Sequence, residues 1–296
     1  MTGFICLDKP ENMTSFYALK KMRYILGEKK IGHTGTLDPM ATGVLTVALG
    51  GATRFIEIIP SHDKSYFAVI RFGILTDTLD VTGNVIKEEK TSVTIKEIEK
   101  AIKSFIGDIN QIPPMYSALK KDGVRLYDLA RQGIEIERQE RPVRIDKIDI
   151  VGFDEKKQEL SVNVDCSSGT YIRSLARDIG ESLSTCATLK KLVRTKANGF
   201  EKCYSLEQIE EYFTSGKISE ILIPTDKVFE NYPSLQVTGP QSVRFSNGGE
   251  LSLDRLKTML DDGFVRVYSP ENVFLGIGQA DNEKNELKVK RVYNER

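Results

Sequence analysis

The sequence has no tryptophan, and its 296 residues include only two histidines and four cysteines. The cysteines show no paired spacing and form no Cys-x-x-Cys, so neither a disulfide framework nor a metal site is predicted. No apolar run reaches the roughly 18 residues that a membrane-spanning helix needs. The first residues lack a basic segment followed by a long apolar stretch, which argues against a secretory signal. These absences favour reduced thiols, no membrane contact and a cytoplasmic location.

The formal net charge is zero, which argues against a uniformly basic nucleic-acid-binding protein. The charges are nevertheless segregated along the chain. Residues 18–33 and residues 186–202 each carry a net charge of +4, whereas residues 201–230 carry −4. A local basic patch can bind a polyanion, and a solvated helix face explains the same charges equally well.

The hydrophobic pattern predicts a mixed α/β protein with two domains. Helices are expected at 14–27, 94–106, 172–183, 187–194 and 205–213, and strands at 43–49, 66–74, 143–151 and 159–166. Short alternating runs then follow at 264–268, 273–277 and 287–292, with one helix expected near 252–260. We place the domain boundary between Pro224 and Pro233, which gives a first domain over residues 1–228 and a smaller β domain over 232–296.

The most informative segment reads GHTGTLDP over residues 32–39. It holds a single carboxylate, Asp38, in a glycine-rich turn, with His33 five residues upstream. Pro39 favours an extended conformation for the residue before it, which would fix the angle of the carboxylate. An Asp-Pro pair is also typical of a helix start, with Asp as the N-cap and Pro in the first turn. The turn therefore predicts either a fixed functional acid or an ordinary helix cap.

Three other segments stand out: KSY at 64–66 followed by TDTLDVTG at 76–83, CSSGTYIRSLARDIG at 166–180, and ATLKKLVRT at 187–195. An aspartic protease would need two Asp-Thr/Ser-Gly turns that share a proton, and neither is present. By residue type alone, Tyr66 is a half-buried strand tyrosine, Arg173 a solvated arginine at a helix start, and Leu192 a core leucine.

Together, these four segments resemble the signatures of the TruB-type tRNA pseudouridine synthases, relatives of dyskerin. The resemblance implies that Asp38 is the catalytic residue, that Arg173 pairs with it, and that Tyr66 stacks on the target uracil. It also implies that Tyr171 lines the uracil pocket and that Leu192 packs against the bound base. His33 would lie where the flipped uridine enters.

The resemblance extends over nearly the whole chain. The segment GFICLDKPENMTS at 3–15 matches a family signature except at Asn12, where the family usually has glycine. Asparagine is the next-best residue for a left-handed turn, so the turn is expected to survive. Residues of about 117–144 resemble the family's RNA-gripping insertion, the thumb, and residues 232–296 resemble its PUA domain. The fold implied is a catalytic domain around a mixed, largely antiparallel sheet, followed by a β-barrel-like PUA domain.

Pseudouridine formation breaks the bond between ribose and N1 of uracil, turns the base and rejoins it through C5. It needs an extruded base, a carboxylate that acts on the nucleoside and an acceptor for the C5 proton, but no redox cofactor. A free tyrosine titrates near pH 10, so Tyr66 would need help to act as that base. We expect no cofactor, uridine-55 in the T-arm loop of tRNA as substrate, no guide RNA, no obligate protein partner and a monomer. The alternatives are a tRNA-folding chaperone on the same scaffold and an RNA-guided pseudouridylation subunit.

Overall fold

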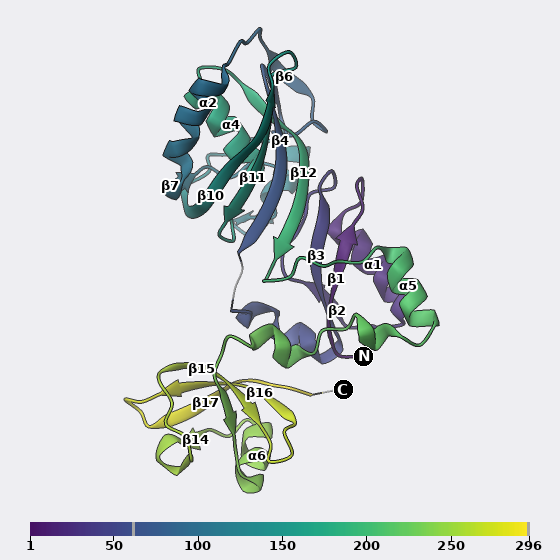
Figure 1. Ribbon diagram of the computed structural model, residues 1–296, viewed down its shortest axis with the longest axis vertical. Coiled ribbons are helices and arrows are strands. Elements are labelled where there is room, and N and C mark those ends of the chain that lie inside the picture. The colour runs from purple at the N-terminus through teal and green to yellow at the C-terminus, as the bar shows by residue number, and fades with distance from the viewer. Residues whose placement is uncertain (61–62, 295–296) are drawn as a thin grey trace.

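The computed structural model describes residues 1–60 and 63–294, and it contains two regions, each built on its own sheet (Figure 1). The strands of the larger sheet are β1 (Gly3–Lys9), β2 (Ile31–His33), β3 (Thr42–Leu49), β4 (Lys64–Phe72), β7 (Gly107–Gln111), β10 (Arg141–Asp154), β11 (Glu159–Cys166) and β12 (Ala187–Ala197). Their order is β1-β3-β12-β4-β11-β10-β7, with β2 paired to β3. Every pair is antiparallel except β3 with β12, so the predicted mixed, largely antiparallel sheet is confirmed.

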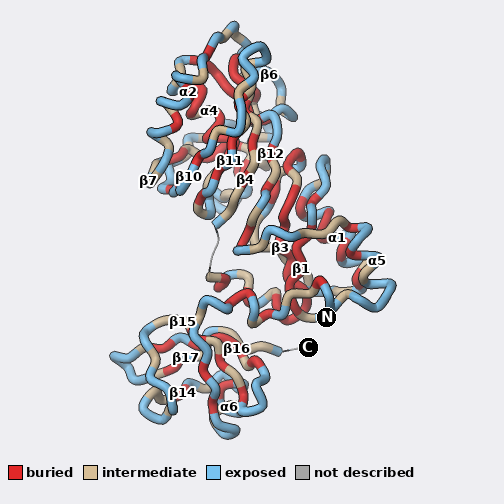
Figure 2. Tube along the Cα trace, viewed as in Figure 1, coloured by how far each residue is buried: buried red, intermediate tan, exposed pale blue. Residues whose placement is uncertain are grey.

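Helices pack on this sheet and close its core. They are α1 (Ser15–Leu26), α2 (Ile95–Ile102), α4 (Ile172–Ser182) and α5 (Leu206–Thr214), with the short α3 (Leu126–Arg131) outside the core. Helices α2 and α4 cover the sheet at β10, β4 and β12, while α1 packs against α5 (Figure 1). Buried residues run along the central strands, as Figure 2 shows in red. The remaining short elements are β5 (Ile74–Thr76), β6 (Val85–Glu88), β8 (Lys120–Lys121), β9 (Val124–Arg125), η1 (Gly50–Ile58), η2 (Lys103–Phe105), η3 (Ile218–Glu220) and η4 (Thr225–Phe229).

Local signals placed three helices correctly. Helix α1 begins at a Thr14 cap and ends at Gly27, which has a left-handed φ of 61°. Helices α2 and α5 begin with capping boxes, which Thr94 forms with Glu97 and Ser205 forms with Gln208. Phe16 lies three residues before the buried Leu19, a spacing typical of one helix face, yet it is 75% exposed.

The helix expected at 187–194 is wrong, because this segment is the central strand β12. The reason lies in a bulge between Leu189 and Lys191, where β12 pairs with β4. The bulge leaves Lys190 and Lys191 both exposed, so the buried leucines at 189 and 192 are three residues apart, as on a helix. The bulge thus explains why buried residues of a strand show the spacing of a helix.

The C-terminal region is a curled five-stranded sheet that resembles half a barrel. Its strands are β13 (Ser234–Gln236), β14 (Leu251–Ser252), β15 (Gly263–Tyr268), β16 (Phe274–Asp281) and β17 (Glu286–Val292), in the order β13-β15-β16-β17-β14. The helix expected near 252–260 is wrong, since only the 3-10 turn η5 (Leu253–Arg255) occurs there. The helix of this region is α6 (Gly239–Ser246), which a capping box of Thr238 and Gln241 begins.

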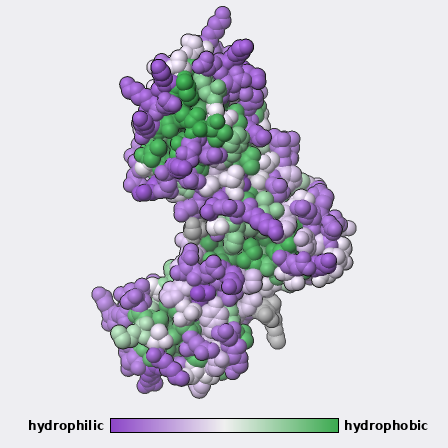
Figure 3. All heavy atoms as spheres, in the orientation of Figure 1, coloured by the Kyte–Doolittle hydropathy of each residue, from purple (hydrophilic) through white to green (hydrophobic). Residues whose placement is uncertain are grey.

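The two regions meet through an aromatic cluster. Phe55 of η1 packs against Phe229, Phe274 and Tyr293, with ring centroids 5.8, 6.1 and 6.3 Å away. An ion pair of 3.0 Å between Arg291 and Glu57 lies beside the cluster. On the face shown in Figure 3, apolar side chains gather in the upper and middle parts of the molecule, and hydrophilic ones dominate its periphery. Among the described residues, no helix combines the length and the apolar character that a membrane crossing requires.

Candidate active site

Asp38 lies in a turn that is tied to α1 rather than at the start of a helix. The Leu37 N–H donates to the Ser15 hydroxyl at 2.9 Å, and that hydroxyl donates back to the Leu37 carbonyl at 3.0 Å. After Asp38 the chain makes a two-residue turn at Pro39 and Met40 and enters β3 at residue 42. The helix-cap interpretation is therefore wrong, and the turn presents a carboxylate fixed by its flanking residues.

Arg173 holds both oxygens of this carboxylate. Its Nε lies 2.8 Å from Asp38 Oδ2, and its Nη2 donates to Oδ1 at 2.8 Å. The same guanidinium donates to the carbonyls of Thr78 and Tyr116, at 3.0 and 2.9 Å. The Arg173 side chain is only 5% exposed, whereas Asp38 keeps 30%. The predicted pairing is confirmed, and a solvated Arg173 is wrong.

The charges around Asp38 act in opposite directions on its protonation. Burial raises the pKa of the Asp38 carboxyl above its ordinary value, the Arg173 guanidinium opposes that rise, and the nearby Asp80 charge adds to it. Asp80 lies 3.7 Å from Arg173 Nη1 and is itself buried. Its other oxygen accepts hydrogen bonds from the Thr82 N–H and the Thr78 hydroxyl. The site is thus one arginine between two aspartates, with only Asp38 open to solvent.

Sequence reasoning did not place Asp80 in the site. In the sequence, Asp80 belongs only to a run that resembles half of an aspartic protease motif. Asp80 reaches the site because Val81 N–H donates to the Leu189 carbonyl, which attaches this loop to β12. A carboxylate flanked by threonines in a turn was the available signal, but nothing local shows which strand receives the turn.

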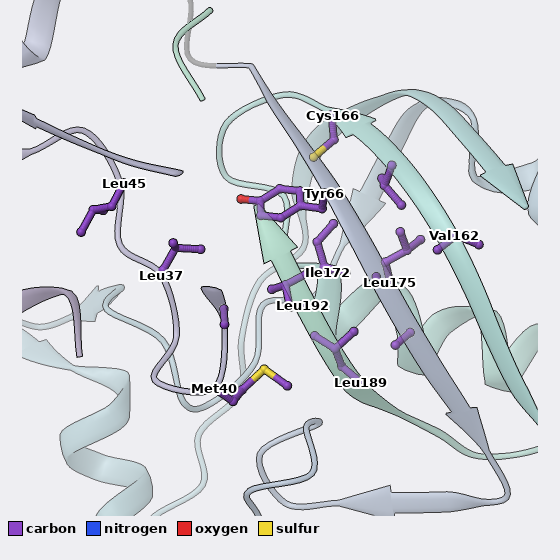
Figure 4. Packing of buried hydrophobic residues seen from close by; sticks show 14 of the residues in the cluster. Leu37, Met40, Leu45, Tyr66, Val162, Cys166, Ile172, Leu175, Leu189 and Leu192 are labelled. Atoms are coloured by element: carbon purple, nitrogen blue, oxygen red, sulfur yellow. The ribbon is translucent and has the colours of Figure 1, made fainter. Parts of the chain in front are cut away.

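Tyr66 and Leu192 form an apolar wall beside the Asp38 turn. They lie on neighbouring strands, β4 and β12, and are 7% and 5% exposed. Figure 4 shows the Tyr66 ring next to Leu192, with its hydroxyl directed toward the turn that carries Leu37. Burial raises the pKa of Tyr66 to about 12, so the phenol stays protonated at neutral pH. The burial expected of a core leucine is confirmed for Leu192, and its contact with a bound base stays a prediction.

Tyr171 is the N-cap residue of α4, two positions before Arg173. Its backbone is fixed by Gln111, whose side chain accepts from the Tyr171 N–H at 2.8 Å and donates to its carbonyl at 3.1 Å. Burial raises the pKa of the Tyr171 phenol. The segment that carries Arg173 is therefore anchored to β7 at the point where it enters the site.

His33 ends β2 and lies on the approach to the turn rather than against Asp38. Its Nδ1 accepts a hydrogen bond from the Gly35 N–H at 3.2 Å. Burial lowers its pKa, and the charge of Arg194 lowers it further, so the ring is neutral at neutral pH. In the described part of the chain, no hydrogen bond or ion pair joins His33 to Asp38.

Arg194 and Lys9 are buried cations whose place in the site the sequence did not indicate. Arg194, 1% exposed, donates from Nε to the Val44 carbonyl at 2.6 Å and from Nη2 to the Gly35 carbonyl at 3.1 Å. Lys9 donates to three carbonyls, including that of Pro39 at 3.3 Å. Both therefore brace the backbone on either side of Asp38. The helix expected at 187–194 would place Arg194 on a solvated face, whereas the strand β12 buries it beside the Asp38 turn.

The thumb-like segment is attached to the site at its base. Tyr116, whose carbonyl accepts from Arg173, leads into the small hairpin β8–β9 and into α3. Lys120 and Lys121 on the hairpin are both exposed, and the guanidinium of Arg125 lies 5.7 Å from the ring centre of Tyr127. This places exposed cations and an aromatic ring on the same segment that holds Arg173.

Comparison with known protein families gives matches over both regions. Residues 23–172 match the model for "TruB family pseudouridylate synthase (N terminal domain)". Residues 233–293 match the model for "Pseudouridine synthase II TruB, C-terminal". The two matches begin and end within the regions built on the two sheets.

Three relatives that match nearly the whole chain are all named tRNA pseudouridine synthase B. A tRNA pseudouridine synthase B of Clostridium kluyveri is 41% identical and covers 99% of this chain and 100% of its own length. That of Clostridium tetani is 43% identical, with 96% and 97% covered, and that of Saccharophagus degradans is 40% identical, with 96% and 93% covered.

Solved structures share the fold. A Cbf5-Nop10-Gar1 complex contains a chain that is 25% identical, with a TM-score of 0.76 over 99% of this chain and 85% of that one. An H/ACA RNP bound to a substrate RNA containing 2'-deoxyuridine contains a chain that is 22% identical, with a TM-score of 0.74 and the same coverage.

Proposed function

The chain belongs to the TruB family of pseudouridylate synthases and is a tRNA pseudouridine synthase. From this premise we propose that Asp38 acts on uridine-55 in the T-arm loop of tRNA. We further propose that it acts as a monomer in the cytoplasm, without guide RNA or an obligate protein partner. In this proposal residues 1–228 form the catalytic domain, with a thumb at about 117–144, and residues 232–296 form a PUA-like RNA-binding domain.

The observation that carries the proposal is the clamp on Asp38. Arg173 binds both carboxylate oxygens, yet 30% of the Asp38 side chain stays exposed. A fixed carboxylate that remains open on one side can reach a nucleoside without first reorganising, which lowers the cost of the reaction. Burying charges is costly even when they are paired, so a protein that only folded RNA would gain nothing from this arrangement.

The remaining site residues supply a pocket for an extruded base. A uracil flipped from the loop would lose its stacking neighbours, and the ring of Tyr66 with the side chain of Leu192 offers an apolar replacement. Tyr171, at the start of α4, would close the pocket on the side of Arg173. His33, neutral on the approach to the turn, would fill the place from which the base departs.

The roles of these residues differ in chemistry. Asp38 would act on the nucleoside as a nucleophile or a base, while Arg173 positions it and opposes the rise in its pKa that burial causes. Tyr66 stays protonated because burial raises its pKa to about 12. Before the reaction it therefore offers an aromatic ring for stacking and not a phenolate that could act as a base. The C5 proton must leave to an acceptor within reach of the base once the new carbon–carbon bond has formed.

Release of tritium from C5 of uridine tests the proposal. The protein alone receives a T-arm stem-loop labelled at C5, because joining the ribose to C5 must expel that hydrogen to water. We expect release of about one tritium per RNA, since a single loop position fits the pocket. Asp38→Asn should bind the RNA like the wild type and release almost nothing, because the chemical step alone is removed.

Three results would contradict parts of the proposal. A single-turnover rate for Asp38→Asn above about a tenth of the wild-type rate would exclude Asp38 as the acting group. Tight binding by the wild type without release would favour a tRNA-folding chaperone. Release that required added RNA or protein would favour a guided subunit.

A further inference from the structure

The outward face of α1 combines aromatic rings and cations and carries no acid. Phe16, Tyr17 and Tyr24 are 75%, 49% and 90% exposed. The cations between them are all exposed as well. We call this surface the α1 face, and its members are Phe16, Tyr17, Lys20, Lys21, Arg23 and Tyr24.

Packing does not explain these aromatic side chains. Helix α1 already anchors itself through Ala18, Leu19, Met22 and Leu26, which are buried on its opposite side. Three exposed rings on a twelve-residue helix are a cost in a protein with no partner for them, and such clusters mark binding surfaces.

The cations of the α1 face are not neutralised within the described parts of the chain. None of Lys20, Lys21 and Arg23 has a carboxylate within ion-pair distance there, and Lys21 lies 5.7 Å from the ring centre of Tyr17. Glu28, the acid that follows the helix, is held at 3.0 Å by the amino group of Met1. The positive charge of α1 is therefore available to a ligand of opposite charge.

The α1 face begins at the active site. Ser15, the residue before Phe16, exchanges two hydrogen bonds with Leu37, the residue before Asp38. From Phe16 to Tyr24 the helix then rises about 12 Å, and the exposed Lys29 and Lys30 follow beyond its end. A polyanion seated over Asp38 could therefore continue along this surface.

Helix α5 limits the surface on one side. The hydroxyl of Ser205 and, less strongly, the charge of Lys21 lower the pKa of the α5 residue Glu207, which places that carboxylate on the Lys21 side of α1. Phe16, Lys20 and Arg23 are spaced four and three residues apart, so they form one stripe of the helix, turned about 100° from the stripe of Tyr17 and Lys21. The open part of the α1 face is this stripe together with Tyr24.

We propose that the α1 face binds the tRNA outside the target pocket, with Phe16 and Tyr24 stacking on unpaired bases and Lys20 and Arg23 contacting phosphates. Alternation of cations and aromatic rings on an exposed surface matches both parts of a nucleotide, since phosphates attract the cations and every base has a face that stacks. An apolar protein partner would match the rings but not three cations without acids. This inference rests on the proposed function, because the RNA is the one whose uridine reaches Asp38.

Two double variants and one matched control test the proposal on full-length tRNA. Lys20→Gln with Arg23→Gln removes two charges, and Phe16→Ala with Tyr24→Ala removes two rings. Lys96→Gln with Lys100→Gln is the control, because these two exposed lysines also lie about one helical turn apart, on α2 and away from the site. Each protein's Kd for tRNA is measured at several salt concentrations, together with tritium release at saturating RNA.

The charge variant is expected to bind at least fivefold more weakly, and the salt dependence of its Kd should fall by about 0.7 to 0.9 in log–log slope per lost phosphate contact. The ring variant should bind about tenfold more weakly with little change in slope. Both variants should keep the wild-type rate of tritium release at saturating RNA. This result distinguishes weaker RNA binding at the α1 face from a loss of the chemical step assigned to Asp38. Affinities equal to those of the control would overturn the inference.

Lysine footprinting on the wild-type protein gives a readout that does not depend on the folding of variants. Saturating tRNA should slow acetylation of Lys20 several-fold while leaving Lys96 and Lys100 unchanged. Equal acetylation of all three lysines with and without tRNA would show that RNA does not cover the α1 face, and it would overturn the inference even if the variants bound weakly.

Discussion

At the scale of single residues, Arg173 links the two carboxylates of the site. Its guanidinium is the group that most strongly opposes the effect of burial on Asp38, and it stands between Asp38 and Asp80. A motif suffices to predict the Arg173–Asp38 pair, because both residues sit in recognisable segments. Asp80, Arg194 and Lys9 could not be predicted, because each reaches the turn through strand pairings that join distant parts of the chain.

Arg173→Met should shift the acid limb of the reaction. The carboxylate form of Asp38 grows as pH rises through its pKa, and burial already raises that pKa above its ordinary value. Without the cation the pKa rises further, so the fall in rate on acidification should begin about 1 to 3 pH units higher. Single-turnover tritium release from pH 5 to pH 9 measures the shift.

Arg177→Met is the matched control, since Arg177 lies one turn along α4 and pairs with Asp178 at 2.6 Å. It should lower stability without moving the acid limb. An acid limb at the same pH in Arg173→Met and in the wild type would mean that another group sets the protonation state needed for the reaction.

At the scale of elements, β12 holds the site together. It contributes Leu192 and Arg194, pairs with both β3 and β4, and receives the loop of Asp80. The bulge in β12 gives its buried leucines the spacing of a helix, so the sequence predicts the wrong element there. The capping boxes of α2 and α5, by contrast, make those helices predictable. Likewise, Asn12 adopts the left-handed φ of 59° that the sequence led us to expect in place of the family's glycine.

Gly43→Ala should separate β3 from β12. A Cβ at Gly43 would lie 2.2 Å from the Arg194 carbonyl oxygen, and the φ of 96° disfavours any side chain. We expect the free energy of unfolding to fall by about 3 kcal/mol, from overpacking and backbone strain together. Chemical denaturation followed by circular dichroism measures it, since the chain has no tryptophan to report unfolding.

Gly152→Ala serves as its control, because a Cβ there would meet no atom within 4 Å and the backbone needs no left-handed φ. Its free energy of unfolding should stay within about 0.5 kcal/mol of the wild type. Equal stabilities of the two variants would show that β3 and β12 can part at Gly43 without cost.

At the scale of the whole molecule, the two regions share apolar contacts. Phe55 of the first region and Phe274 of the second belong to one buried cluster, so the chain should unfold as one unit although its sheets are separate. The sequence predicted three strands of the C-terminal sheet, because short alternating runs mark β15, β16 and β17. It did not predict the shared cluster, because the partners of Phe55 lie far along the chain.

Phe274→Ala should weaken both regions. The centre of the Phe274 ring lies 6.1 Å from that of Phe55 and 5.4 Å from that of Tyr293. Removing the ring should lower the free energy of unfolding by about 3 to 5 kcal/mol. Hydrogen exchange should then accelerate in η1 of the first region as well as in β16. The neighbouring Val273→Ala, 57% exposed, should change neither, and acceleration confined to β16 would show that the regions are independent.

The position of Tyr293 in this cluster also affects the order of events during synthesis. Phe55 leaves the ribosome early, but the ring that completes its surroundings is made 238 residues later. At the usual rates of translation this delay is roughly ten to fifty seconds. For that time the nascent chain carries an open aromatic surface on an otherwise assembled sheet. A chaperone that binds exposed rings would therefore find its target on the growing polypeptide and lose it when residue 293 docks.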